Sequence, residues 1–372
     1  MDLVSLTAVF VLLAAPALAD SLDVAIGQKL FKRQWVSAPS STKSNDGLGP
    51  LYAAPSCASC HPGGGGGVTP VVRFGLGEGG DPVYGRQLQP FAVTGLDGEG
   101  TARIIGTDGR PSVTIEGLAY GPLDPATRIG LRRPPGLGGL GAVAALGDDA
   151  ILANAGTLGG RPNRRPDGRI GRFGWKAADA DIEEQVAAAF SLDMGLSTRL
   201  RPDPYGDCTP AQGACRAAPT GSDHGEPEIA DPILAAISAY VASLTAPSPD
   251  PAAPGGAAFE RLGCAACHRP MLSDISGRTA AVFSDLLLHE MGPDLDDGVA
   301  EPGVASSEWR TAPLIGLGAR LAAGGALLHD GRATTIAGAV AAHGGQAGAT
   351  RAAFDRASPE ERAALESYLK GL

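Results

Sequence analysis

Two copies of one pentapeptide place cysteine and histidine at a spacing that could bind a redox cofactor. They read CASCH over residues 57–61 and CAACH over residues 264–268. Two thiols separated by two residues can add to the two vinyl groups of one porphyrin, and the histidine that follows can bind the iron. With six cysteines and six histidines in 372 residues, roughly 0.002 such matches are expected by chance, and a zinc site would require the two pairs to converge. The motifs therefore predict two covalently attached haem c groups, with Cys57, Cys60, Cys264 and Cys267 as attachment residues and His61 and His268 as iron ligands.

The two remaining cysteines, Cys208 and Cys215, flank a short loop that contains proline and glycine but no neighbouring histidine. In an oxidising compartment such a pair is typical of a short-loop disulfide. A reactive dithiol is the alternative, although no adjacent lysine or histidine is present to activate a thiol.

An internal repeat indicates how the two irons differ. An offset of 154 residues aligns residues 172–190 with the segment that ends at His343, so that two short helices with an apolar Ile/Val stripe correspond. His343 then lies on the helix opposite the second motif, and its counterpart in the first repeat is Ala189, which cannot bind iron. We therefore expect a second haem with two histidine ligands, His268 and His343, and a first haem with an open position for peroxide or another small ligand.

Four residues of the first repeat should cover that open face: Trp175, Gln185, Asp193 and Met194. Asp193 could move protons at a bound peroxide, and Trp175 could relay electrons between the haems. Each has an ordinary alternative, since Trp175 and Met194 could be core residues and the other two could be polar or capping groups. The sixth ligand of the first iron stays open between none, Met194 and His289.

The overall composition favours a loop-rich fold completed by its cofactors. Glycine (54) and proline (30) are abundant, aromatic residues make up 5 % of the chain, and hydrophobic residues make up 44 %. The formal net charge of −10 argues against a nucleic-acid partner. Five arginines between residues 161 and 172 could neutralise haem propionates. The predicted fold class is mainly α, with two cytochrome c-like haem domains and long irregular loop insertions.

The chain is expected to divide into four segments. Residues 1–19 form an apolar run ending in a small-x-small pattern, which predicts a signal peptide and export to the periplasm, with no membrane span in the mature chain. Residues 20–245 would form the first haem domain, 246–256 a Pro-rich linker and 257–372 the second haem domain.

Helix signals support this division. Pro232 should open a helix before the linker, and a capping box at Ser358 should start a terminal helix. Gly27 and Gly256 occupy matching places before the two haem motifs.

Several longer segments resemble the di-haem oxidoreductase family, also labelled thiol oxidoreductase, which is related to bacterial di-haem cytochrome c peroxidases and MauG-type enzymes. These segments are YGRQLQ (84–89), GRFGWKA (171–177), DLLLHEMG (285–292), EWRTAPLIGLG (308–318) and LHDGRATTIAGAVAAHGG (328–345). The resemblance implies a peroxidase-like oxidoreductase that exchanges electrons with a periplasmic donor or acceptor protein.

The same resemblance bears on individual residues. The relatives carry an iron ligand fourteen residues beyond the histidine of their H-[DN]-G motif, where this chain has His343. Trp175 and Gln185 match two residues near the open iron of those relatives, and the third place, a glutamate there, is Gly195, with Asp193 two residues earlier. The alternative to an enzyme is an electron-transfer protein in which both irons are six-coordinate.

Overall fold

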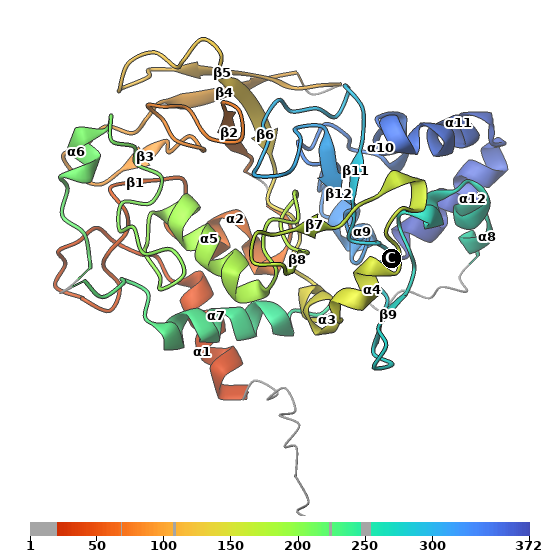
Figure 1. The fold of residues 1–372 in the computed structure, drawn as a ribbon, viewed down its shortest axis with the longest axis horizontal. Helices are drawn as coiled ribbons and strands as arrows, with labels where there is room; N and C mark the ends of the chain where they lie inside the picture. Colours follow the sequence, from red (N-terminus) through yellow and green to blue (C-terminus); the bar gives the residue numbers. More distant parts are fainter. Residues whose placement is uncertain (1–20, 68, 107–108, 223–224, 247–253) are drawn as a thin grey trace, which may run out of the picture.

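The computed structural model describes residues 21–372 except 68, 107–108, 223–224 and 247–253, so the predicted signal peptide and most of the predicted linker lie outside the described residues. Short helices and strands alternate with long loops (Figure 1). The helices are α1 (Ser21–Lys32), α2 (Cys57–Cys60), α3 (Leu140–Ala145), α4 (Asp148–Leu152), α5 (Ile182–Met194), α6 (Gly213–Arg216), α7 (Asp231–Ser243), α8 (Gly256–Arg261), α9 (Leu317–Ala322), α10 (Ile336–Ala341), α11 (Gly348–Arg356) and α12 (Pro359–Lys370).

The strands form two-stranded antiparallel ribbons in the described part of the chain. The paired strands are β1 (Leu51–Tyr52) with β3 (Phe91–Ala92), β2 (Val71–Gly75) with β6 (Arg128–Arg132), β4 (Thr101–Ile105) with β5 (Ser112–Glu116), β7 (Asn163–Arg164) with β8 (Ile170–Gly171), β9 (Leu272–Ser273) with β10 (Thr279–Ala280), and β11 (Leu288–Glu290) with β12 (Glu308–Arg310). None of the helices that the described residues form is long and apolar enough to span a membrane.

The prediction of a mainly α fold is wrong. Helices account for 32 % of the structure and strands for 16 %, so the fold class is mixed. The strands lie largely in the insertion of the first half, where β2 pairs with β6 in the register Val71↔Arg132 and β4 pairs with β5 in the register Thr101↔Glu116. Three consecutive β-branched residues in β5, Val113, Thr114 and Ile115, favour strand formation, and the abundant glycines and prolines keep most helices short.

In the first half, α1 crosses α7 at very short distance. A Cβ added to Gly27 would lie 1.9 Å from the carbonyl oxygen of Ala236, so only glycine permits this approach. The rings of Phe31 and Tyr240 pack edge to face beside the crossing, with centroids 5.2 Å apart. As expected, α7 begins with a proline in its first turn.

The second half repeats this crossing between α8 and α12. A Cβ added to Gly255 would lie 2.2 Å from the carbonyl oxygen of Ala364, and the rings of Phe259 and Tyr368 have centroids 5.5 Å apart. The residue equivalent to Gly27 is therefore Gly255, one position before the predicted match. The capping box at the start of α12 is confirmed.

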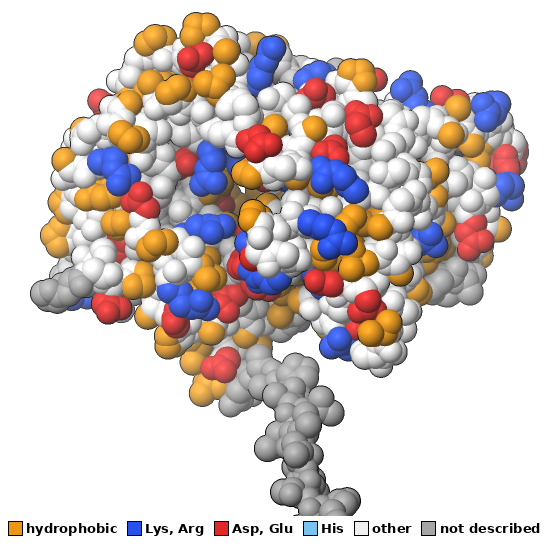
Figure 2. Space-filling view, viewed as in Figure 1, with side chains coloured by type: hydrophobic (Ala, Val, Ile, Leu, Met, Phe, Trp, Pro, Cys, Tyr) orange, Lys and Arg blue, Asp and Glu red, His pale blue; other side chains and the backbone are white. Residues whose placement is uncertain are grey.

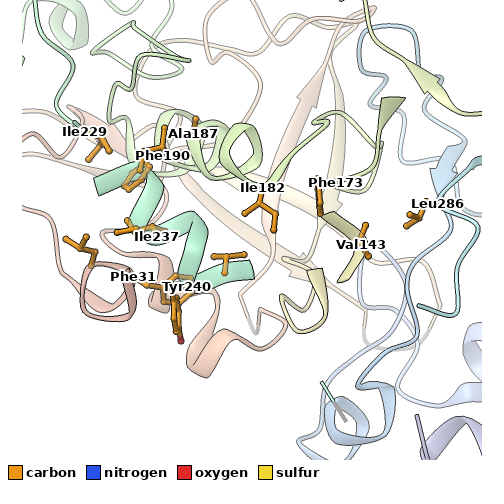
Figure 3. Packing of buried hydrophobic residues seen from close by; sticks show 14 of the residues in the cluster. Phe31, Val143, Phe173, Ile182, Ala187, Phe190, Ile229, Ile237, Tyr240 and Leu286 are labelled. Atoms are coloured by element: carbon orange, nitrogen blue, oxygen red, sulfur yellow. The ribbon is translucent and has the colours of Figure 1, made fainter. Parts of the chain in front are cut away.

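Two hydrophobic cores underlie the fold. The first core packs α1, α5 and α7 against α3 and α4, and Figure 3 shows its labelled members, which include Phe31, Phe173, Ile182, Phe190, Ile237 and Tyr240. This core also contains residues that follow the predicted linker, such as Val282, Leu286 and Leu287, each 0 % exposed. The second core joins α8, α10, α11 and α12.

Candidate haem sites

The second CxxCH motif places two histidine rings face to face across a gap. Cys264 begins the 3₁₀ turn Cys264–Ala266, and His268 follows it, with its Nδ1 donating to the carbonyl oxygen of Phe283 at 3.1 Å. His343 follows α10, and its Nδ1 donates to the carbonyl oxygen of Ala339 at 2.7 Å. The ring centroids of the two histidines are 6.5 Å apart, and their planes differ by 51°. The structure thus brings together the two residues that the sequence assigns to the second iron.

This gap fits one metal ion bound between two imidazoles. A metal–nitrogen distance of about 2.0 Å, plus about 1.1 Å from each nitrogen to its ring centre, gives a centroid separation of about 6.2 Å. Because both Nδ1 atoms are engaged by backbone carbonyls, each ring can turn its Nε2 lone pair to the metal. Burial, together with the neighbouring His343, lowers the pKa of His268 to about 4, and burial lowers that of His343, so both rings are neutral ligands.

His289 lies beside the second motif. Its Nδ1 is 3.9 Å from the Cys267 Sγ and 2.9 Å from the Gln346 Oε1, and its Nε2 is 2.9 Å from a carboxylate oxygen of Asp285. Burial opposes protonation of His289, but the hydrogen bonds and negative charges of Asp285 and Cys267 together outweigh it and raise the pKa to about 10. Both ring nitrogens are thus occupied next to the second haem site, which leaves His289 without a free nitrogen for the first iron.

The first CxxCH motif has no facing histidine among the described residues. Cys57 and Cys60 begin and end the single-turn helix α2, which Ser56 caps by accepting a hydrogen bond from the backbone of Ser59. His61 donates from Nδ1 to the carbonyl oxygen of Gly65 at 3.1 Å, and burial lowers its pKa. The ring has a second backbone contact, with Pro135, and its lowered pKa keeps the imidazole neutral, as at the second site.

Asp193 lies beside the segment that leads into the first motif, where its carbonyl oxygen accepts hydrogen bonds from the backbone N–H groups of Ala53 and Ala54 at 2.8 and 3.1 Å. Burial, reinforced by the negative charge of Asp193, raises the pKa of Cys57 to about 12 and that of Cys60 to about 11. Burial also raises the pKa of Asp193 itself, and its Oδ1 accepts a hydrogen bond from the Gln87 Nε2 at 2.9 Å. The structure therefore places Asp193 beside the segment that leads into the first motif, and its role in proton transfer stays a prediction.

Helix α5 positions this carboxyl group. Asp181 caps its first turn, and the repeat offset of 154 holds in space, because α5 begins at Ile182 and α10 at Ile336. Gly195 ends α5 with φ of 67°, and a Cβ there would lie 2.7 Å from the Cα of Gly49. A glutamate side chain therefore has no room at this position, and Asp193 is the acidic residue at the C-terminal end of α5.

The other two predicted residues of α5 differ in character. Gln185 keeps a buried Oε1 for which the described residues provide no hydrogen-bond partner, and this atom lies near Gly174, next to Trp175. Such an orphaned buried acceptor is what a site built around a missing group would leave. Met194 is 2 % exposed and packs in the first core.

Trp175 belongs to an aromatic group that joins the two halves. Its Nε1 donates to the carbonyl oxygen of Arg133 at 2.7 Å, and its ring lies edge-on to Trp309 and His329, at centroid distances of 6.3 and 6.5 Å. Trp309 and His329 stack in parallel, 3.8 Å apart. The ammonium of Lys176 lies 3.5 Å from the centre of the Trp309 ring. Trp309 and Lys176 were not assigned from the sequence, although both lie in segments quoted above, 308–318 and 171–177.

Four of the five arginines between residues 161 and 172 form ion pairs within the protein. Arg161 pairs with Glu308, Arg165 and Arg169 pair with Glu184, and Arg172 pairs with Asp148. Buried arginine Nε atoms without a described hydrogen-bond partner occur at Arg172, within this run, and also at Arg73 and Arg269. Arg269 directly follows His268, so it is better placed than the predicted run to meet a propionate there.

The predicted disulfide is confirmed, since Cys208 and Cys215 are joined in the structure. The remaining described cysteines, at the two motifs, are free thiols, as the attachment of haem requires.

Comparison with known proteins identifies one family. The sequence signature described as "Di-haem oxidoreductase, putative peroxidase" matches residues 138–372. No curated protein matches the chain. One solved structure, of hydrazine synthase from Kuenenia stuttgartiensis, aligns over 100 % of this chain and 99 % of its own, with 15 % identity and a TM-score of 0.36, too low to support an argument.

Proposed function

Because the chain belongs to the di-haem oxidoreductase family, with the redox function and haem cofactors that this implies, we propose that it is an exported c-type oxidoreductase with two unlike haems. One would be held by Cys264, Cys267 and two histidines, and would only pass electrons. The other would be held by Cys57, Cys60 and His61, and would keep an open position for peroxide or a small molecule from an unknown partner.

The observation that carries this proposal is the contrast between the two motifs. His343 lies opposite His268 across a gap of metal-binding size, whereas the first motif has no facing histidine among the described residues and has Asp193 beside it, whose carbonyl oxygen accepts hydrogen bonds from the N–H groups of Ala53 and Ala54. A carboxyl group beside an open position suits proton transfer to a reacting ligand better than it suits closure of the iron. The difference favours an enzyme over a simple electron carrier.

Different residues of the chain would serve proton transfer and histidine orientation in peroxide reduction. In that reaction the O–O bond breaks, two electrons arrive from a periplasmic donor protein, two protons are taken up and two waters leave. Haem, when bound, supplies the electron transfer and the binding of peroxide. Asp193 would hold and pass a proton at the peroxide oxygens. The backbone carbonyls of Gly65 and Phe283 would fix the orientation of the two proximal histidines.

Spectroscopy of the holoprotein tests this proposal. We expect the oxidised protein to show one high-spin and one low-spin haem, and cyanide or hydrogen peroxide to change the high-spin signal alone. The alternative, an electron-transfer protein with Met194 or another group closing the first iron, predicts two low-spin haems in every redox state and no response to either ligand. That result would refute the proposed enzyme.

A further inference from the structure

The segment 84–89, which the proposed function leaves unexplained, reaches the end of α5 with two glutamine side chains. Gln87 donates from Nε2 to the Oδ1 of Asp193 at 2.9 Å, and Gln89 donates from Nε2 to the carbonyl oxygen of Leu192 at 2.7 Å. Both glutamines are buried, at 0 % and 3 % exposure. The two side chains are similarly buried and each donates a hydrogen bond to α5, but Gln87 is the one that contacts the Asp193 carboxyl group.

We propose that Gln87 is a positioning residue, which fixes the Asp193 carboxyl group for proton transfer at the first haem, and that the disulfide-bonded loop in turn fixes Gln87. This inference rests on the proposed function and deepens it. Asp193 has no ion pair with a cationic side chain in the described part of the chain, so the amide of Gln87 is its directional contact.

The backbone of Gln87 is held from two sides. On one side the segment runs along β2, where the backbone N–H of Phe74 donates to the carbonyl oxygen of Arg86, and that of Leu88 donates to Val72, at 2.8 and 2.9 Å. On the other side the backbone N–H of Gln87 donates to the Oδ2 of Asp207 at 3.0 Å.

Asp207 lies at the edge of the loop that the disulfide closes. It directly precedes Cys208, and its carboxylate also accepts hydrogen bonds from the backbone N–H and the Nε of Arg86, at 2.5 and 3.2 Å. A second arm of the same loop reaches Gln89, because Gln212 donates to one oxygen of Glu99 at 2.6 Å, and the other oxygen accepts from the backbone N–H of Gln89 at 2.6 Å. Asp207, at the edge of the disulfide loop, and Gln212, within it, therefore hold the segment on both sides of Gln87.

A displaced carboxyl group should cost rate rather than binding. Loss of one hydrogen bond frees the Asp193 side chain to turn, and misplacement of a reacting group by about 1 Å can reduce a rate about 100-fold. Peroxide would bind the iron as before, so the concentration dependence should change little.

The test mixes fully reduced holoprotein, which holds the two electrons itself, with hydrogen peroxide and follows haem reoxidation by stopped flow. We expect Gln87→Leu to lower the maximal rate about 10- to 100-fold and to change the half-saturating peroxide concentration less than about threefold. Gln89→Leu is the matched control and should stay within about threefold of the wild type. Equal rates for the two variants would overturn the inference.

A double-mutant cycle separates positioning from a merely structural role. If Gln87 acts through Asp193, then adding Gln87→Leu to Asp193→Asn should lower the rate by less than about threefold more. If the double variant instead loses rate by the product of the two single-variant factors, the inference is overturned. If Gln87→Leu fails to bind haem, Asp207→Asn can replace it, because it keeps the Gln87 side chain and weakens the hydrogen bond that holds its backbone. An unchanged rate in Asp207→Asn would also overturn the inference. A wild-type protein whose first haem ignores cyanide and peroxide would refute the proposed function itself, and this inference with it.

Discussion

Replacing His343 with alanine tests the assignment of the second iron most directly. With the two rings 6.5 Å apart, the Nε2 of His343 would lie about 2.0 Å from a shared metal. The Cβ of an alanine would lie about 5.5 Å from it, by the length of the missing ring. No ligand bond is conceivable at that distance, so the second haem should become five-coordinate and high-spin.

The change in spin state should be large, and the fraction of haem that changes can be quantified. Both haems stay attached through their cysteines, so a pyridine haemochrome assay should still give two haems per chain. Electron paramagnetic resonance should show that about half of the total haem changes from low spin to high spin. The lost hydrogen bond to the Ala339 carbonyl should cost about 1 kcal/mol of stability. Added imidazole fits the vacated space and should restore the low-spin signal.

His329→Ala provides the control for this variant. His329 is also a buried histidine, 4 % exposed, but it stacks on Trp309 and does not face His268. Its removal should leave the spin state of the second haem unchanged. A low-spin second haem in His343→Ala without imidazole would show that some other group binds that iron.

Three further predictions concern stability. Replacing both Cys208 and Cys215 with serine should lower the free energy of unfolding by about 2–3 kcal/mol, as expected for a loop of this length, in urea titrations of the holoprotein. Gly27→Ala should cost about 1–3 kcal/mol or more, because its Cβ would collide with a carbonyl of α7, whereas Gly213→Ala, with nothing within 4 Å, should be nearly neutral. Burial raises the pKa of Glu99 to about 8, so the folded state binds a proton that the unfolded state releases near pH 4.5; stability should fall as pH rises between these values, and Glu99→Gln should remove that part of the slope. Equal slopes for wild type and variant would contradict the assignment to Glu99.

The chemistry-bearing residues were predictable where their signal was local. The CxxCH spacing, the start of α5 and α10 at an offset of 154, and the placement of His343 after α10 all follow from short windows of sequence. The capping box of α12 and the proline of α7 are equally local.

The rest depends on contacts between distant residues. Gln87 meets Asp193 across 106 positions, and Arg161 finds Glu308 across 147, and no local pattern signals either pair. The same holds for the ribbon of β2 and β6, whose strands are separated by a long insertion. A mainly α expectation arose because helix signals are periodic and local, whereas strand pairing is not.

The first core includes Val282, Leu286 and Leu287 from beyond the linker together with residues from helices of the first half, and Figure 3 labels Leu286 among them. Space-filling packing leaves no broad seam between the two halves on the face seen in Figure 2, only a hollow near its centre. Separating the halves would bring those fully buried side chains into water, so unfolding of one half removes support from the other. The duplicated haem sites are thus cooperative in the thermodynamic sense: heat should melt them in a single transition, and neither half should persist as a stable fragment once the chain is cut between them.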